Sequence, residues 1–108
     1  MTSVNVTVAN ECIAQYNSTL KSLPMASQAK EHTTSVGFPS KELMAWLKSV
    51  TPHMSELRVV FGEYTHKHVP AKAGRLTVFL WPYDAKGNPA KDQNNDLINP
   101  VNLGDLTP

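Results

Sequence analysis

The residues in this sequence that are best suited to bind a metal or take part in a reaction are Glu63, His66 and His68. His66 and His68 are two positions apart, so on an extended segment both imidazole rings would point to the same side. Imidazole nitrogens and carboxylate oxygens are common ligands of Zn²⁺, which needs three or four ligands at about 2.0–2.2 Å. A small metal-binding protein or hydrolase that uses these three residues is therefore one functional hypothesis. Solvated loop histidines are the simpler interpretation, because Lys67 and Lys72 stand nearby and oppose a bound cation.

Other signatures of catalysis or cofactor binding are absent from the sequence. Its five glycines form no phosphate-binding loop of either common pattern. Asp92, Asn94 and Asp96 begin like a calcium loop, but Leu97 and Leu103 stand where that loop needs a glycine and a bidentate glutamate. We therefore expect no cofactor and nominate no catalytic residue, which favours a protein that is not an enzyme without deciding the question.

Length and charge exclude several classes of partner. The chain has 108 residues, the size of one domain, and ten basic against nine acidic residues give a formal net charge of +1. No global field draws in nucleic acid or anionic lipid, so we expect neither as a partner. No apolar stretch approaches the length of a membrane span, and the first ten residues do not resemble an export signal. With Cys12 as the only cysteine, a reducing cytoplasmic location is expected.

Two segments have the periodicity of helices. Apolar residues spaced three and four apart predict the first helix, from Thr7 to Ser22, with Thr7 or Ser3 as its cap and Cys12 buried on its apolar stripe. A second stripe predicts a helix that is capped by Ser40 and ends at Thr51, before a proline. The two stripes consist of Val8, Cys12, Ile13, Tyr16, Leu20 and Leu23, and of Leu43, Met44, Leu47 and Val50.

The remaining elements are extended. Residues 56–64 and 75–83 alternate like strands and carry apolar groups on both faces, so they are predicted to be central, antiparallel neighbours joined by the loop 65–74. A short strand is expected within 33–38, and a turn at 84–88, where Gly87 supplies a positive φ. Residues 25–32 are weakly helical or irregular.

The sequence as a whole predicts an α+β fold. We expect an antiparallel sheet of three to four strands with two helices packed on one face, because helices and strands are segregated along the chain. Residues 1–108 form a single domain, of which 88–108 is a polar C-terminal extension packed on the body.

Several strings of residues support a resemblance to a known group. They are Phe38-Pro-Ser-Lys-Glu-Leu, Leu57-Arg-Val-Val-Phe-Gly-Glu-Tyr, the segment from Gly74 to Asn88, and Asn102-Leu-Gly-Asp-Leu. In this order the chain resembles a family of small uncharacterised proteins common in Bacteroidota genomes. The resemblance implies a bacterial source and one compact domain, and it implies no activity.

The leading functional hypothesis is a small, soluble, non-enzymatic binding domain. Its partner would be another protein or a second copy of the chain. The expected interaction loop lies between the two central strands and includes Lys67, His68 and Lys72, because loops on a rigid scaffold commonly carry binding residues.

Overall fold

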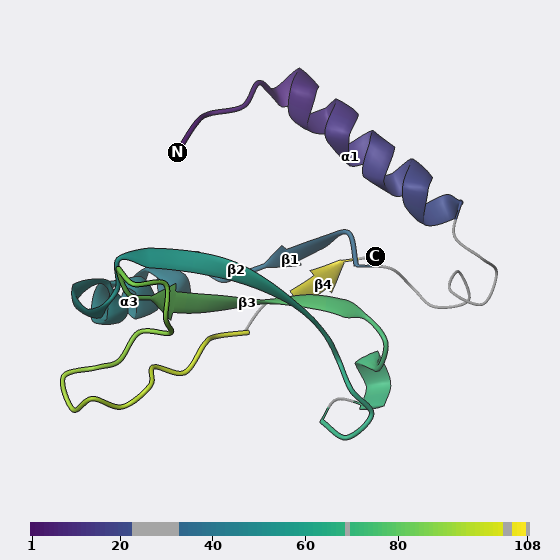
Figure 1. Cartoon of the computed structure of the whole chain (residues 1–108). Coiled ribbons are helices and arrows are strands. Elements are labelled where there is room, and N and C mark those ends of the chain that lie inside the picture. The colour runs from purple at the N-terminus through teal and green to yellow at the C-terminus, as the bar shows by residue number, and fades with distance from the viewer. Residues whose placement is uncertain (23–32, 69, 103–104, 108) are drawn as a thin grey trace.

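A computed structural model of the chain describes residues 1–22, 33–68 and 70–102, and the strand 105–107 (Figure 1). The fold is α+β, as the sequence predicts. The elements in chain order are α1 (Val6–Lys21), β1 (Ser35–Gly37), α3 (Ser40–Val50), a 3₁₀ turn (Thr51–His53), β2 (Glu56–Glu63), a second 3₁₀ turn (Pro70–Lys72), β3 (Leu76–Tyr83) and β4 (Asp105–Thr107). The segment 25–32, expected to be weakly helical or irregular, lies outside the described residues.

Helix α1 has nearly the predicted bounds, but its cap and its surroundings differ from the prediction. Asn5 is the N-cap, and its side-chain oxygen accepts a hydrogen bond of 2.7 Å from the Thr7 amide; neither Thr7 nor Ser3 caps the helix. No residue of α1 is buried, and Cys12 is exposed. The prediction that Cys12 is a buried core residue is therefore wrong, because none of the described parts of the chain covers the apolar stripe of α1 around Cys12.

Helix α3 begins at Ser40, the residue that the sequence predicts as its cap. Ser40 is the first helical residue, and the N-cap is Pro39, whose side chain makes no capping hydrogen bond. At the other end the Thr51 hydroxyl donates to the Leu47 carbonyl at 2.5 Å. The chain then continues into a 3₁₀ turn that contains Pro52, since a proline near the start of a helix lacks only an N–H that would be unpaired anyway.

Strands β2 and β3 form the predicted antiparallel pair. Their register runs from Glu56 opposite Tyr83 to Glu63 opposite Leu76, which gives a twisted two-stranded ribbon. Gly62 makes room for the Phe79 ring, since a Cβ at position 62 would lie 2.8 Å from it. The ribbon is a sheet of two strands, and the short β1–β4 pair is a second one. The predicted sheet of three to four strands is therefore not confirmed.

The position of β2 corrects a second expectation. Among the described residues β2 pairs only with β3, so it is an edge strand rather than a central one. β3 also meets the C-terminal extension through paired backbone hydrogen bonds of 3.0 and 3.1 Å between Leu80 and Val101. The apolar side chains on both faces of β2 misled the prediction, since such a pattern normally marks a strand with two neighbours.

The C-terminal extension follows the ribbon after a turn at Asp84. The Asp84 carboxylate accepts from the amides of Lys86 (2.9 Å) and Asn88 (3.0 Å), and Gly87 has the expected positive φ of 81°. Asp92 forms the same arrangement with the amides of Asn94 and Asp96. The calcium-like spacing of these three residues is thus a turn in which one carboxylate binds backbone amides.

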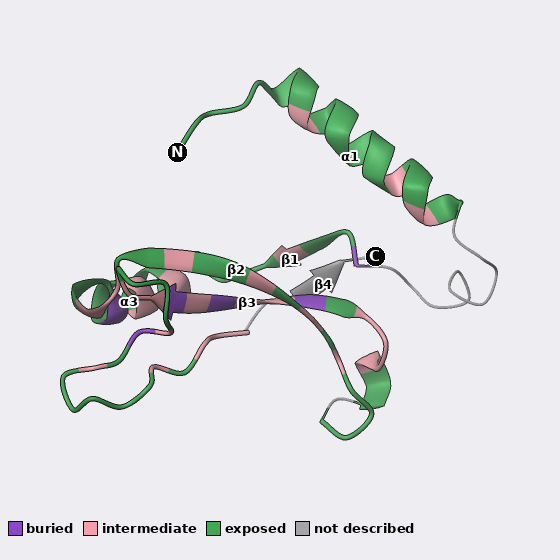
Figure 2. Cartoon of the chain, in the orientation of Figure 1, coloured by how far each residue is buried: buried purple, intermediate pink, exposed green. Residues whose placement is uncertain are grey.

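The small core is centred on β3 (Figure 2). Its buried apolar residues are Val50, Leu80 and Ala90, beside the fully buried Thr77. Helix α1 stands clear of the ribbon in Figure 1, so the expected packing of both helices on one sheet face is not confirmed. Across the described residues, no helix is long and apolar enough to cross a bilayer.

Candidate functional site: an apolar groove between β1 and the ribbon

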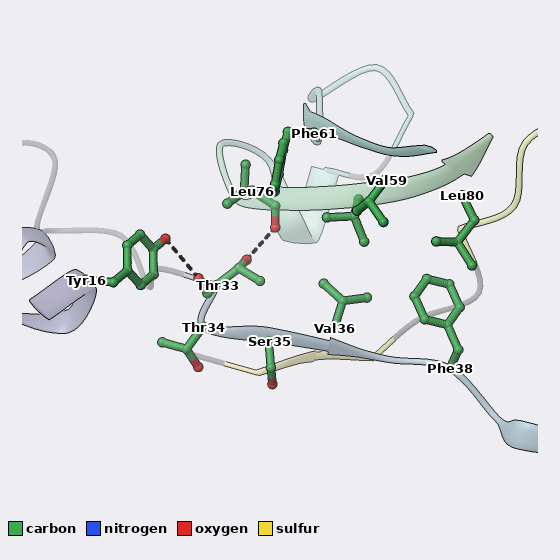
Figure 3. Close-up of a pocket in the computed structure, with 11 residues that line it drawn as sticks. Tyr16, Thr33, Thr34, Ser35, Val36, Phe38, Val59, Phe61, Leu76 and Leu80 are labelled. Carbon is green, nitrogen blue, oxygen red and sulfur yellow. Dashed lines mark hydrogen bonds between the residues drawn. The ribbon is translucent and has the colours of Figure 1, made fainter. Parts of the chain in front are cut away.

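An apolar groove separates the segment around β1 from one face of the β2–β3 ribbon (Figure 3). It encloses about 400 Å³, which lies within the range of about 300–1,000 Å³ typical of ligand pockets. Its lining comes from four parts of the chain: Tyr16 of α1; Thr33, Thr34, Ser35, Val36 and Phe38 around β1; Val59 and Phe61 of β2; and Leu76, Val78 and Leu80 of β3.

Alternation along the strands decides which side chains face the groove. Val59 is paired with Leu80 and Phe61 with Val78, and paired residues of an antiparallel ladder share a face. On the opposite wall, Val36 points from β1 toward the ribbon, and Phe38 follows it (Figure 3). Both walls of the groove therefore carry apolar side chains, as the walls of a protein core do.

Thr33 lies at the end of the groove next to Tyr16 of α1 and connects the groove's two walls there. Its hydroxyl donates to the Leu76 carbonyl of β3, and the Tyr16 hydroxyl donates to the Thr33 carbonyl at 3.4 Å (Figure 3). Thr33 itself is only 5% exposed. One threonine thus ties the start of β1 to the ribbon and holds the C-terminal half of α1 at the groove's end.

The β2 side of the groove's ribbon wall is exposed. Val59 is 53% exposed and Phe61 is 69% exposed, although both side chains are of the type that folding normally removes from water. Among the described lining residues there is no carboxylate, imidazole, thiol or amine. This surface can bury apolar groups but carries no acid–base pair or nucleophile with an activating partner.

A buried polar network supports the other side of the ribbon. The Thr77 hydroxyl lies 3.2 Å from the Asn102 side-chain oxygen and 3.4 Å from the Tyr64 hydroxyl, to which the Asn102 amide donates at 2.9 Å. The network joins β3, the end of β2 and the C-terminal extension. It holds the ribbon from the side opposite the groove, because Thr77 alternates with Leu76 and Val78.

The residues of the metal hypothesis do not converge. Glu63, His66 and His68 are exposed, and no three His, Cys, Asp or Glu side chains gather into a metal-binding group in the part of the chain that the structure describes. The His68 amide instead donates to the Thr65 hydroxyl at 3.3 Å, which closes a local turn. A metal site on these residues would require a rearrangement of the loop.

The expected interaction loop has two exposed members and one engaged member. Lys67 and His68 are exposed, whereas Lys72 is half-buried and places its ammonium 5.7 Å from the centre of the Tyr64 ring. This cation–π contact belongs to the protein's own packing. The role of the loop in binding stays a prediction.

A second polar cluster lies at the end of the ribbon where Glu56 pairs with Tyr83. The Arg58 guanidinium stacks 4.1 Å above the Tyr83 ring, and its Nε donates to the Glu56 carboxylate at 2.5 Å. This hydrogen bond raises the pKa of Arg58 above its ordinary value. Because the pair is exposed, it contributes little to stability.

Comparison of the chain with protein-family models, with curated proteins and with solved structures finds no match. The resemblance to a Bacteroidota family therefore stays a prediction, and the function has to be argued from the groove itself.

Proposed function

We propose that this chain is a non-enzymatic protein-binding domain whose binding surface is the groove between β1 and the β2–β3 ribbon. The observation that carries the proposal is the exposure of Val59 and Phe61 on an open apolar wall. Contiguous exposed apolar surface of this kind marks an interaction site more often than a solvated surface, since leaving it in water is unfavourable. The mainly apolar lining favours a polypeptide with apolar side chains as the ligand.

The proposal places binding away from the loop that contains Lys67, His68 and Lys72. The groove offers burial of an aromatic side chain, and such residues dominate binding energies at interfaces. The exposed lysines of the loop offer screened charges, which change association rates more than affinity. Phe61 is therefore the expected centre of the binding surface.

Selection of short peptides from a random displayed library against the full chain tests the proposal. We expect peptides with apolar side chains at intervals, and we expect Phe61→Ser to weaken their binding at least about 30-fold, which corresponds to the loss of a hot-spot residue worth about 2 kcal/mol. Met44→Ser is the matched control, because Met44 is also an exposed apolar residue but lies on α3 outside the groove.

Two results would overturn the placement. Peptides that bind wild type and Phe61→Ser equally well would exclude the groove, and peptides that lose affinity on Lys67→Ala would move the site to the loop. Far-ultraviolet circular dichroism of each variant confirms that the fold is intact before binding is compared.

A further inference from the structure

Helix α1 carries a second exposed apolar surface. Val6, Ile13 and Tyr16 are 74%, 55% and 41% exposed. Together with Ala9 and Leu20 they follow one another at intervals of three and four residues, which places all five on one face of the helix. This face contains no charged residue, so it can be buried without desolvating a charge.

The groove wall of the ribbon is exposed over one part of its length. Val59, Phe61 and Leu76 are 53%, 69% and 38% exposed, whereas Leu80 and Pro82 on the same face are buried. The only charged residue on this face of the ribbon is Glu63 at its end. The chain therefore presents one exposed apolar helix face and one exposed apolar patch on a sheet face.

The whole chain exposes more surface than a compact monomer. Its accessible surface is 8094 Å², whereas a monomer of 11.9 kDa exposes about 6,000 Å². The radius of gyration is 16.5 Å, against about 13 Å for a compact domain of this length. The excess of roughly 2,000 Å² is more than twice the roughly 800 Å² that each partner of a stable interface buries.

The position of α1 leaves the exposed part of the ribbon wall uncovered by its own helix. The Tyr16 hydroxyl bonds the Thr33 carbonyl at the groove's end, and the rest of α1 stands clear of the ribbon (Figure 1). Ile13 and Val6 are therefore exposed rather than packed on Val59 and Phe61. The α1 helix of a second copy offers the same apolar face.

We infer that two copies form a symmetric dimer in which α1 of each chain lies on the groove face of the other chain's β2–β3 ribbon. The arrangement covers both apolar surfaces of both chains at once, and it is self-complementary, as a two-fold interface must be. Exchange of one helix is a low-cost route to such a dimer. The inference deepens the proposed function and rests on it, because it names the partner of the same groove.

Native mass spectrometry and sedimentation of the full chain, each at several concentrations, give the first test. We expect a dimer whose dissociation constant rises at least tenfold in Ile13→Lys and in Phe61→Glu. Thr19→Lys is the matched control on α1, because Thr19 is exposed and outside the apolar face; it should remain dimeric.

Mixing the two impaired variants gives the sharper test. In an exchanged dimer the mixture contains one intact contact, between the wild-type helix of Phe61→Glu and the wild-type ribbon of Ile13→Lys, and the other contact pairs a lysine with a glutamate. We therefore expect the mixture to form heterodimers more tightly than either variant forms homodimers. A dimer built from helix on helix, or from strand on strand, would not recover on mixing, and that result overturns the inference.

Small-angle scattering of the wild-type chain provides a measurement that needs no variant. A monomer at all concentrations, whether compact or extended, overturns the dimer. If the chain is monomeric but selected peptides still depend on Phe61, the dimer falls and the proposed groove stands. If Phe61 affects neither association nor peptide binding, both fall.

Discussion

Replacing Thr77 by valine isolates the contribution of one buried hydroxyl group. Thr77 is fully buried, and valine has nearly the same shape, so the change removes a polar group without opening a cavity. The hydroxyl lies 3.2 Å from the Asn102 side-chain oxygen and 3.4 Å from the Tyr64 hydroxyl, and both are left with one neighbour fewer.

The expected loss follows from the desolvation of the groups left behind. A buried polar group that loses its partner costs about 1–3 kcal/mol. Because Asn102 is only half-buried and still donates to Tyr64, we expect the lower part of this range, about 1–2 kcal/mol. In a domain of this size that lowers the Tm by about 5–15 °C.

Thermal and urea denaturation of Thr77→Val, Asn102→Leu and the double variant measure this coupling. The double variant should lose about 1 kcal/mol less than the sum of the single losses, because the second substitution removes a group that the first has already left unpaired. Thr19→Val is the control, since its hydroxyl is exposed, and its effect should stay within about 0.5 kcal/mol. A stable Thr77→Val, or strictly additive losses, would refute the reasoning.

Three further substitutions test single features of the fold. Gly87→Ala forces a side chain onto a φ of 81° and should destabilise the chain by about 1–2 kcal/mol in urea denaturation; an unchanged midpoint would contradict the turn. Gly62→Ala places a methyl group 2.8 Å from the Phe79 ring and should cost about 1–3 kcal/mol, and full stability would mean that the ring moves aside freely. Asn5→Ala removes the cap of α1 and should reduce helicity by circular dichroism with a loss of about 1 kcal/mol; unchanged helicity would show that the cap is dispensable.

The sequence could not predict the groove as a site, although its residues were visible. The alternation of Val59 and Phe61 with Val60 indicates a strand with two apolar faces, and burial on both faces is the normal consequence. Among the residues that the structure describes, β2 pairs on one edge only, and Val59 and Phe61 are exposed on its groove face, so these residues form an open surface.

The histidines show the opposite case. Their spacing suggests converging ligands only if the segment is extended, and the chain turns there instead, with the His68 amide bonded to Thr65. Convergence of ligands depends on backbone direction over several residues, which spacing alone does not specify.

Local interactions determined what the sequence by itself could settle. The 3.6-residue and two-residue periods located α1, α3, β2 and β3 to within one or two residues, and the Asp84 turn followed from an acceptor carboxylate and a glycine that tolerates positive φ. These features depend on neighbours within a few positions along the chain. Only the tertiary structure decided that β2 is an edge, that Cys12 is exposed and that Thr33 joins α1, β1 and β3. Those outcomes depend on which distant surfaces meet, and an apolar pattern states that a face must be covered without stating by what.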